Sequence, residues 1–408
     1  CWMYVIPYPF NISEVPMNLL FYRYGSICEP DIIEGFRELG NQVTEITLEI
    51  YNKNLGPLEG LTALKNELFA HSYDFVFSIN YYPFISEICN IFQIRYLCWT
   101  VDCPVMELYS DTVSNPWNRI FLFDRAQYEE IAPQNPGCIF HLPLASNPSR
   151  WHSVLQKASP TEHAKYAGDV TFVGSLYTEK CPYDRLQTDS AYLRGYLEGI
   201  MDAQRSIYGC YFLEDLLPDS IVAEFREALP GFYIPPEKSI RDDRVAMAQI
   251  YLCAKISAQE RVRTMQLLGN HYPVTLYTGS DSTGLPVQNK GLVKTLTEMP
   301  LVFSNSKINL NITAKSIRSA LPLRIFDILA CGGFCLTNYQ PELEDLFTVG
   351  EDLDCYVSED DLLAKTEYYL SHEKERAEIA QNGLLTVQKK HNYPERLLTM
   401  ISLAYGLS

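Results

Sequence analysis

Short apolar segments alternate with helical patterns through the first 150 residues of the chain. Each segment is rich in Phe, Ile, Leu, Val and Tyr, and turn-forming residues separate it from the next. Such segments predict buried strands, and the apolar residues spaced three and four positions apart between them predict helices. Strands that alternate with helices indicate an open parallel sheet. The predicted strands are 18–22, 43–48, 74–80, 95–101, 118–124 and 138–143, and the predicted helices are 30–39, 61–70 and 85–92.

The second half of the chain resumes this alternation after a long helical stretch. Residues 169–174 have the pattern of a strand that runs into a Gly-Ser turn, and 274–277 have the pattern of the next strand. Between them, residues 183–270 carry apolar side chains mostly at helical spacing. We therefore expect a helical insertion between the first and second strands of a second sheet.

Residues 308–346 form the clearest strand, helix and strand step. Apolar residues alternate with asparagine over 308–312, polar and basic residues follow, and Pro322 suits the first turn of a helix. Gly332 supplies the positive φ that ends this helix before the next strand. The start of such a helix can bind a phosphate because its first N–H groups are unpaired and carry partial positive charge.

Two domains are expected because 408 residues exceed what one hydrophobic core organises. We assign residues 1–150 to the first domain and 151–392 to the second, with the helical insertion at 183–270. The crossing at 143–160 is rich in loop and turn residues. Residues 393–408 have the apolar face of a final helix that packs back on the first domain.

Composition narrows the classes of partner. The net charge of −17 is spread along the chain, which argues against nucleic acid or an anionic membrane, since either requires a basic face. No run of 18 or more uncharged apolar residues is present, which argues against a transmembrane segment. The 12 cysteines form no CxxC pair and no cluster with histidine, so we expect free thiols in a cytoplasmic protein.

Arg324 and Asp327 are the candidate ligands at the start of the predicted helix. The guanidinium fork of Arg324 can hold a pyrophosphate through two hydrogen bonds. Asp327, one turn further on, offers two acceptor oxygens that suit a ribose diol. The alternative is that the two residues form an ordinary solvated ion pair three positions apart.

A family resemblance favours the nucleotide site. The run DILACG from Asp327 to Gly332 resembles the EAMACG run of GT-B glycosyltransferases, in which the acidic residue holds the ribose of a nucleotide-sugar donor. The longer pattern, SKINLNIT with LPLRIFDILACGGF and Pro341-Glu342, resembles the CgeB-like glycosyltransferases. The resemblance implies an α/β GT-B fold with two Rossmann-like domains facing a cleft. Retaining relatives would carry an acid at position 319, where this chain has Ser319, so a retaining mechanism does not transfer.

The resemblance also implies a set of donor-binding residues. The run GSLYTEK resembles the Gly-Arg-Leu-x-x-x-Lys run whose two cations touch the donor phosphates, but serine replaces the arginine and only Lys180 keeps a charge. Further segments of the first 150 residues, such as YLCWTVDCP, resemble the domain that accompanies CgeB-like transferases. The expected donor-binding residues are Gly174, Ser175, Lys180, Thr278, Gly279, Asn311, Thr313, Arg324, Asp327 and Gly332.

Asp102 is the first candidate for a general base. It follows a predicted strand of the domain opposite the donor, and apolar segments on both sides could desolvate it and raise its pKa. The alternative, of equal weight, is a turn residue that bonds the backbone before Pro104. Glu87, Asp124 and His141 are second candidates, and His141 also suits a structural role. The expected acceptor-side residues are Tyr24, Gly25, Asn80, Tyr81 and His141.

The sequence thus favours a glycosyltransferase that moves a sugar from a UDP-linked donor to a protein or glycan acceptor. No metal and no separate cofactor are expected, because GT-B enzymes usually stabilise the leaving diphosphate with cations and helix termini. Two alternatives stay open: a sugar-nucleotide epimerase on the same fold, and a spore-coat type structural or binding protein that has lost the chemistry.

Overall fold

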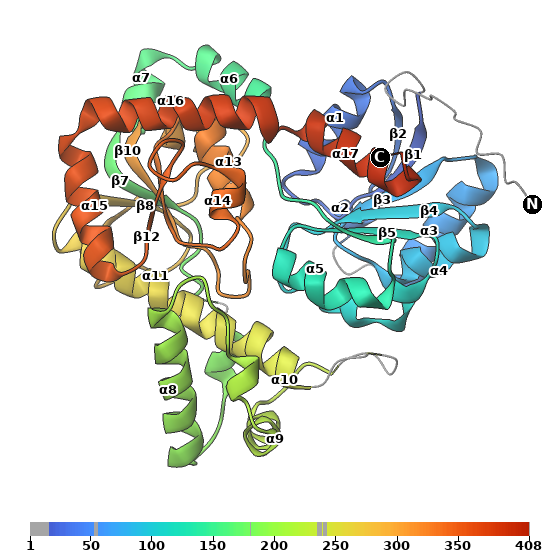
Figure 1. Cartoon of the computed structure of the whole chain (residues 1–408), viewed down its shortest axis with the longest axis horizontal. Coiled ribbons are helices and arrows are strands. Elements are labelled where there is room, and N and C mark those ends of the chain that lie inside the picture. The colour runs from blue at the N-terminus through green and yellow to red at the C-terminus, as the bar shows by residue number, and fades with distance from the viewer. Residues whose placement is uncertain (1–15, 53–55, 180, 235–238, 240–242, 408) are drawn as a thin grey trace, which may run out of the picture.

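The computed structural model describes residues 16–52, 56–179, 181–234, 239 and 243–407. Two α/β domains lie side by side, and a helical insert extends from the second domain along one side of both (Figure 1). We call the parts the N-terminal domain (β1 to β6), the C-terminal domain (β7 to β12) and the insert (residues 182–269). The expected α/β class with two parallel-sheet domains is confirmed.

The N-terminal domain is built on six parallel strands in the order β2-β1-β3-β4-β5-β6. All five residues of β3 are buried, as expected for a parallel strand with helices on both faces of its sheet. The strands are β1 (Asn18–Tyr22), β2 (Gln42–Ile46), β3 (Phe75–Ile79), β4 (Arg95–Trp99), β5 (Asn118–Leu122) and β6 (Ile139–His141), and the helices are α1 (Glu29–Glu38), α2 (Leu48–Tyr51), α3 (Pro57–Ala70), α4 (Pro83–Phe92) and α5 (Arg125–Ile131).

The C-terminal domain has a second parallel sheet in the order β12-β11-β10-β7-β8-β9. The predicted step over 308–346 is present as β10, α13 and β11, and Gly332 ends α13 with φ of +70°. The strands are β7 (Gly168–Val173), β8 (Val274–Tyr277), β9 (Gln288–Asn289), β10 (Ser306–Asn311), β11 (Cys335–Asn338) and β12 (Asp354–Tyr356), and the helices are α12 (Met299–Asn305), α13 (Leu323–Ala330), α14 (Leu343–Leu346), α15 (Glu359–Ser371) and α16 (Glu373–Lys390).

The insert between β7 and β8 is helical, as predicted. Its main helices are α8 (Ala191–Ser206), α9 (Asp219–Ala228), α10 (Asp243–Ala246) and α11 (Cys253–Gly269), and a π-helical stretch over Met247–Leu252 joins α10 to α11.

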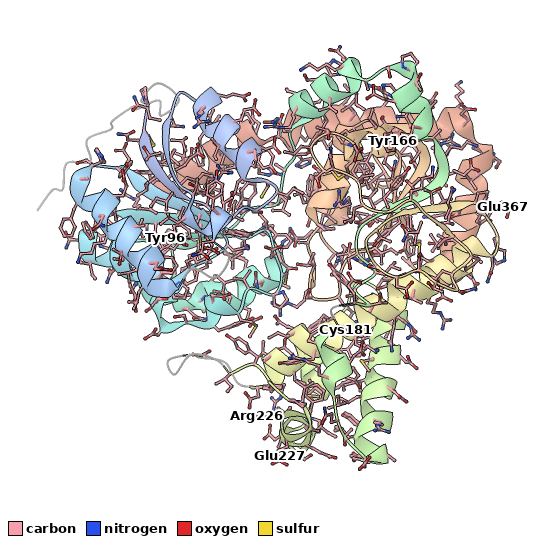
Figure 2. The ribbon with its side chains drawn as sticks, turned by 180° about the vertical axis from the view of Figure 1, so that it is seen from behind. Tyr96, Tyr166, Cys181, Arg226, Glu227 and Glu367 are labelled. Atoms are coloured by element: carbon pink, nitrogen blue, oxygen red, sulfur yellow. The ribbon has the colours of Figure 1, made fainter. Side chains whose placement is uncertain are left out.

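The insert also contacts the N-terminal domain. Arg226 and Glu227 lie at its outer end, far from the C-terminal sheet (Figure 2). Near the domain boundary, Val245 is buried in the same cluster as Leu108 and Tyr109 of the N-terminal domain. The insert therefore bridges both domains.

The crossing between the domains is more ordered than predicted. Instead of loops, it contains α6 (Pro148–Lys157) and α7 (Pro160–Lys165). Asn147 caps α6 by accepting a hydrogen bond from the Arg150 N–H (3.0 Å), and Trp151 on α6 is buried. The asparagine, serine and proline residues that suggested turns are helix-start signals here.

The last part of the chain adds one more strand to the second sheet and ends in helices. β12 forms before α15 begins. The last helix, α17 (Tyr393–Tyr405), packs against α1, and the Arg95 guanidinium lies 4.2 Å from the Tyr405 ring centroid. None of the helices in the described part of the chain combines the length and the apolar composition that a membrane span requires.

Candidate functional site

A cleft of about 360 Å³ lies between the carboxyl ends of the two sheets, where open parallel sheets bind ligands. Both domains and the insert contribute to its walls. The polar and aromatic side chains and the turn that line it include Asp102 from the N-terminal domain, Gly174, Ser175, Tyr177, Asn311, Thr313 and Arg324 from the C-terminal domain, and Arg261 from the insert.

Arg324 stands in the first turn of α13, at the edge of the cleft. Its guanidinium contacts the sulfur of Met299 and lies 5.5 Å from the ring centroid of Phe303. Among the described side chains no carboxylate forms an ion pair with it, so the expected alternative of an ion pair with Asp327 is not present. Burial lowers the pKa of Arg324, and the charge of Arg261 lowers it further, although Asp327 acts in the opposite direction.

Arg261 is a cleft residue that the sequence analysis missed. It lies on α11, and its side chain donates to the carbonyl oxygens of Ser175 (2.6 Å) and Ile312 (2.7 Å). Its guanidinium stacks 4.1 Å from the Tyr177 ring centroid, while its buried Nε has no hydrogen-bond partner. Burial lowers the pKa of Arg261.

The two arginines give one wall of the cleft a positive charge that no direct ion pair within the described residues neutralises. Isolated buried charges are costly, and the cost falls when a counter-charge binds. Nothing in the described part of the chain supplies that counter-charge as an ion pair to either arginine. This wall is therefore suited to an anion with several oxygen acceptors.

Asp102 faces this wall from the N-terminal domain. Its Oδ2 accepts hydrogen bonds from Asn80 Nδ2 (2.7 Å) and from the Tyr24 hydroxyl (3.3 Å). The turn-residue alternative predicted bonds to the following backbone, but the described contacts of the carboxylate are with these side chains. Asp102 is exposed, so the desolvation expected from the flanking apolar segments is absent.

Gly25 lies in the same edge of the N-terminal domain, but its N–H is already occupied. The N–H groups of Tyr24 and Gly25 both donate to the buried carboxylate of Glu29, at 2.9 and 3.0 Å. These groups stabilise the loop after β1 and are not available to a ligand.

Other expected donor-side residues support the cleft wall from behind. The Thr278 hydroxyl is buried and accepts a hydrogen bond from the Ser280 N–H (3.1 Å), and Ser280 Oγ accepts one from the Leu176 N–H (2.8 Å). Together they brace the turn that begins at Gly174. Gly279 is exposed beside Leu292 and is not among the residues that line the cleft.

Asn311 and Thr313 line the cleft but are bonded to protein. Asn311 Nδ2 donates to Thr313 Oγ1 (3.1 Å) and to Thr337 Oγ1 (2.9 Å), and the Thr313 N–H donates to Asn338 Oδ1 (2.7 Å). These bonds fix the backbone that follows β10.

Asp327 faces the domain crossing and not the cleft. Its buried carboxylate accepts a hydrogen bond from Ser146 Oγ (2.8 Å), which in turn accepts one from Trp151 Nε1 (2.8 Å). Gly332, at the far end of α13, also lies away from the cleft and serves to end the helix. Lys180 lies outside the described residues.

Tyr81 and His141 are placed away from the cleft. The buried Tyr81 hydroxyl is bonded to Thr112 Oγ1 (2.8 Å), and His141 Nε2 lies 2.8 Å from Glu342 Oε2 of the C-terminal domain. Glu87 is exposed on α4 and does not line the cleft. Of the five acceptor-side residues, Tyr24 and Asn80 are therefore the two joined to Asp102.

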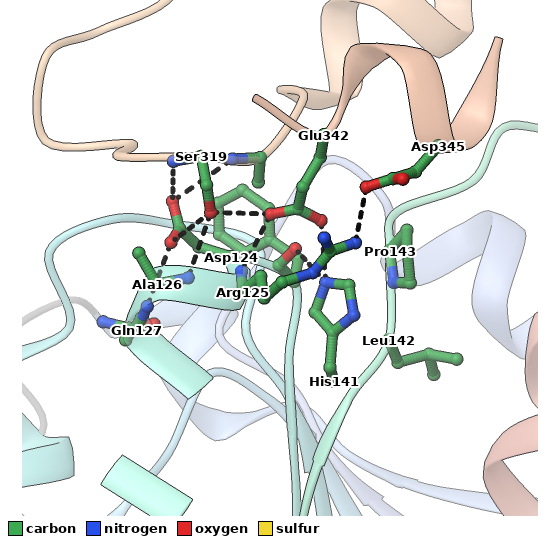
Figure 3. A network of polar contacts seen from close by, with 12 residues as sticks. Asp124, Arg125, Ala126, Gln127, His141, Leu142, Pro143, Ser319, Glu342 and Asp345 are labelled. Carbon is green, nitrogen blue, oxygen red and sulfur yellow. Dashed lines mark hydrogen bonds and ion pairs between the residues drawn. The ribbon is translucent and has the colours of Figure 1, made fainter. Parts of the chain in front are cut away.

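Asp124, a second candidate for the base, instead joins the two domains (Figure 3). Its fully buried carboxylate accepts hydrogen bonds from the N–H groups of Arg318 (2.7 Å) and Ser319 (3.1 Å) in the C-terminal domain. It also accepts from the Gln127 N–H (3.0 Å), and the Ser319 hydroxyl oxygen lies 3.1 Å from it. A carboxylate with so many donors and no solvent access is unsuited to removing a substrate proton.

Glu342 extends this network along the domain boundary. Its buried carboxylate accepts hydrogen bonds from Ser319 Oγ (2.7 Å) and the Arg125 N–H (2.9 Å), in addition to the His141 contact. The hydrogen bonds hold the pKa of Glu342 below its usual value even though burial acts to raise it. Ser319, the residue at the position of the retaining acid, is thus part of the domain boundary.

The described residues contain no group of three His, Cys, Asp or Glu side chains arranged to hold a metal ion. Every cysteine in this part of the chain is a free thiol, and most are buried. Burial raises the pKa of Cys103 and Cys28, the two thiols that line the cleft.

The C-terminal part of the chain, which forms one wall of this cleft, matches a known protein family. Residues 251–402 match the model of a glycosyl transferase-like family. The matched range includes Arg261 and Arg324 but not Asp102. None of the curated protein sequences matches the chain.

Solved structures resemble the chain over nearly its full length. Anabaena HepE in complex with UDP-glucose is 11% identical, with 96% of this chain and 100% of that chain covered and a TM-score of 0.54. A glycosyltransferase from Rickettsia africae is 9% identical, with 96% and 98% covered and a TM-score of 0.52. Sucrose-phosphate synthase from Thermosynechococcus elongatus is 9% identical, with 96% and 99% covered and a TM-score of 0.52. These similarities show the GT-B fold.

Replacing Asp124 by alanine should destabilise the protein by about 3 kcal/mol, because buried N–H groups lose a charged acceptor. Urea unfolding measures the change. The matched control is Asp345→Ala, which removes the half-exposed ion pair with Arg125 (2.7 Å) at the same boundary and should cost less than about 1 kcal/mol. Equal effects of the two substitutions would contradict the role given to Asp124.

Asp327→Asn should leave nucleotide affinity unchanged and should alter the pH dependence of stability. Burial raises the pKa of Asp327 to about 6 from 3.8, so the folded state loses stability relative to the unfolded state as the pH rises from 3.8 to about 6, and the full penalty is present above that pH. The variant should therefore gain roughly 1–3 kcal/mol over wild type at pH 7.5 and should keep only part of this advantage at pH 5. Unfolding at both pH values is the measurement, and an advantage that grows at pH 5 would refute this assignment.

Proposed function

We propose that the protein is a glycosyltransferase that moves a sugar from a nucleotide-sugar donor, UDP-linked, to a hydroxyl group of a protein or glycan acceptor. The observation that carries the proposal is the cleft itself. Arg261, which is buried, and Arg324, which is half-buried, form one wall without an ion-paired carboxylate among the described side chains, and Asp102 faces them from the other domain.

The donor diphosphate fits the cationic wall. Each guanidinium can bind two phosphate oxygens with paired N–H donors, and the start of α13 adds unpaired backbone N–H groups and partial positive charge. Arg261 Nε is a buried donor without a partner, so this guanidinium has hydrogen-bonding capacity that the described side chains do not use. Arg261 contacts Ser175 where related transferases have an arginine, and it supplies a cation that Ser175 lacks.

The choice of UDP rests on the structural neighbours. Anabaena HepE was solved with UDP-glucose, and a trehalose-phosphate synthase from Burkholderia xenovorans, 10% identical with a TM-score of 0.50, is described as UDP-forming. The CgeB-like pattern over 308–346 supports assignment to that type of transferase.

The chemical step is a direct displacement. An acceptor hydroxyl oxygen forms a bond to the anomeric carbon of the donor sugar while the bond from that carbon to the β-phosphate oxygen breaks. The electron pair of the broken bond stays on UDP, where Arg261 and Arg324 stabilise the added charge. The acceptor proton passes to Asp102. A double displacement needs a carboxylate nucleophile, and this chain has Ser319 at the position where retaining relatives carry an acid. The absence of an acid at that position favours the single step.

The cleft lining also bears on the alternatives. The described lining residues include Asp102 as their only carboxylic acid and no histidine, whereas an epimerase needs several acid and base groups around the donor. A protein that only binds would keep affinity for UDP and release none from a UDP-sugar. Assays of binding and of turnover therefore separate these readings.

Arg324→Ala and Arg261→Ala should each weaken UDP binding by roughly 2–3 kcal/mol, because each removes a charge-assisted contact to phosphate. Calorimetry measures the affinity. The matched control is Arg263→Ala on the same helix, since Arg263 is exposed and paired with Glu359, and its variant should bind UDP as wild type does. Unchanged affinity in both test variants would place the donor elsewhere.

Asp102→Asn should keep UDP affinity near wild type and lower turnover by roughly 10²-fold or more, because the amide keeps the shape and loses the proton acceptor. The assay is UDP release from UDP-glucose, UDP-galactose and UDP-N-acetylglucosamine, with water as the acceptor. Full turnover in the variant would remove Asp102 from the mechanism and leave a base-free, retaining reaction as the better account.

A further inference from the structure

Asn80 adopts a backbone conformation that side chains other than glycine rarely take. It follows β3 directly and has φ of +57°, in the left-handed region. Its N–H donates to the Trp99 carbonyl (2.9 Å), and its own carbonyl accepts from Ser78 Oγ (2.7 Å). Asparagine tolerates this region better than most residues, yet such positions still cluster at functional sites.

The left-handed turn directs the Asn80 side chain toward the end of β4. Its Oδ1 accepts hydrogen bonds from the N–H groups of Val101 (3.0 Å) and Asp102 (3.4 Å). Backbone N–H groups can only donate, so the amide oxygen must face them and the amide nitrogen must face the other way. Nδ2 consequently donates to Asp102 Oδ2 at 2.7 Å.

The two carboxylate oxygens of Asp102 have different surroundings. Oδ2 is held by Asn80 and by the Tyr24 hydroxyl, whereas Oδ1 accepts no hydrogen bond within the described part of the chain. Burial, together with the charge of Asp102, raises the pKa of Tyr24, so its hydroxyl stays protonated and continues to donate. A carboxylate fixed through one oxygen and open at the other has the form of an oriented base.

We propose that Asn80 is a positioning residue for Asp102, with Tyr24 as a weaker second contact, so that Oδ1 is the oxygen presented to the acceptor hydroxyl. The inference rests on the proposed function, because it assigns a role to Asp102 in that reaction. It adds that the loop after β3 supplies the residue that fixes the geometry of the base. Asn80 itself touches no reacting atom.

In a purely structural role, Asn80 would only hold the ends of β3 and β4 together. The bonds from Oδ1 to the two N–H groups would be sufficient for that purpose. Aspartate at position 80 would keep those two bonds and the tolerance for positive φ, and it would replace the donor to Asp102 Oδ2 by a second carboxylate, which repels Asp102. Asn80→Asp therefore keeps the link between the two strand ends and removes the support for Asp102.

The experiment compares UDP release from the three UDP-sugars named above, together with UDP affinity by calorimetry. Asn80→Asp should lower kcat by about 10-fold or more with UDP affinity within about twofold of wild type. Tyr24→Phe should lower kcat only a few-fold. The control is Ser78→Ala, which removes a hydrogen bond to the same turn without touching Asp102 and should lower the melting temperature but not kcat.

The outcomes separate this inference from the proposed function. An Asn80→Asp enzyme with wild-type kcat, while Asp102→Asn has lost turnover, would overturn the positioning role alone. The same would follow if Ser78→Ala lowered kcat as much as Asn80→Asp, because the effect would then be a loosened turn. A wild-type protein that releases no UDP from any of the three sugars would overturn the proposed function, and the inference with it.

Discussion

The buried carboxylate of Asp124 is the constraint on which the geometry of the cleft depends. It belongs to the N-terminal domain, yet its acceptor oxygens satisfy backbone N–H groups at Arg318 and Ser319 of the C-terminal domain. The same loop forms part of the cleft wall and leads into α13, which carries Arg324. A loop without regular structure has no ladder to fix its N–H groups, so an external acceptor must do so. Asp124 thereby sets the cationic wall at a fixed position relative to Asp102.

Two further features hold the domains in this arrangement. The insert leaves the C-terminal sheet after β7 and contacts the N-terminal domain through Val245, and α17 crosses to α1 on another side of the molecule (Figure 1). The insert also supplies Arg261, so it contributes directly to the site. The long helix of the insert, α11, packs against the other helices of the insert. Its Ser257 accepts a hydrogen bond from the loop after β10, and its Arg261 lines the cleft. Packing and ligand binding are therefore functions of the same helix.

The sequence predicted the two sheets well because buried parallel strands and intervening helices have strong periodic patterns. It also predicted which strand ends meet, and so placed Asp102, Ser175 and Arg324 at one cleft.

The direction in which each side chain points could not be predicted from the sequence. Asp327 lies one turn beyond Arg324, and only the packed structure shows that it meets Ser146 of the crossing. Arg261 was missed because it lies far from Arg324 in the chain, in a helix whose spacing of apolar residues indicated only packing within the insert. His141 and Asp124 have partners in the other domain, which no local pattern records.

The central claim is that a nucleoside diphosphate binds between Arg261, Arg324 and the start of α13, opposite Asp102. A crystal structure of the protein with UDP tests it most directly. The diphosphate oxygens should accept hydrogen bonds from both guanidinium groups, and Asp327 should stay bonded to Ser146. UDP bound outside this cleft, or bound in it with neither arginine in contact with phosphate, would rule out this donor site.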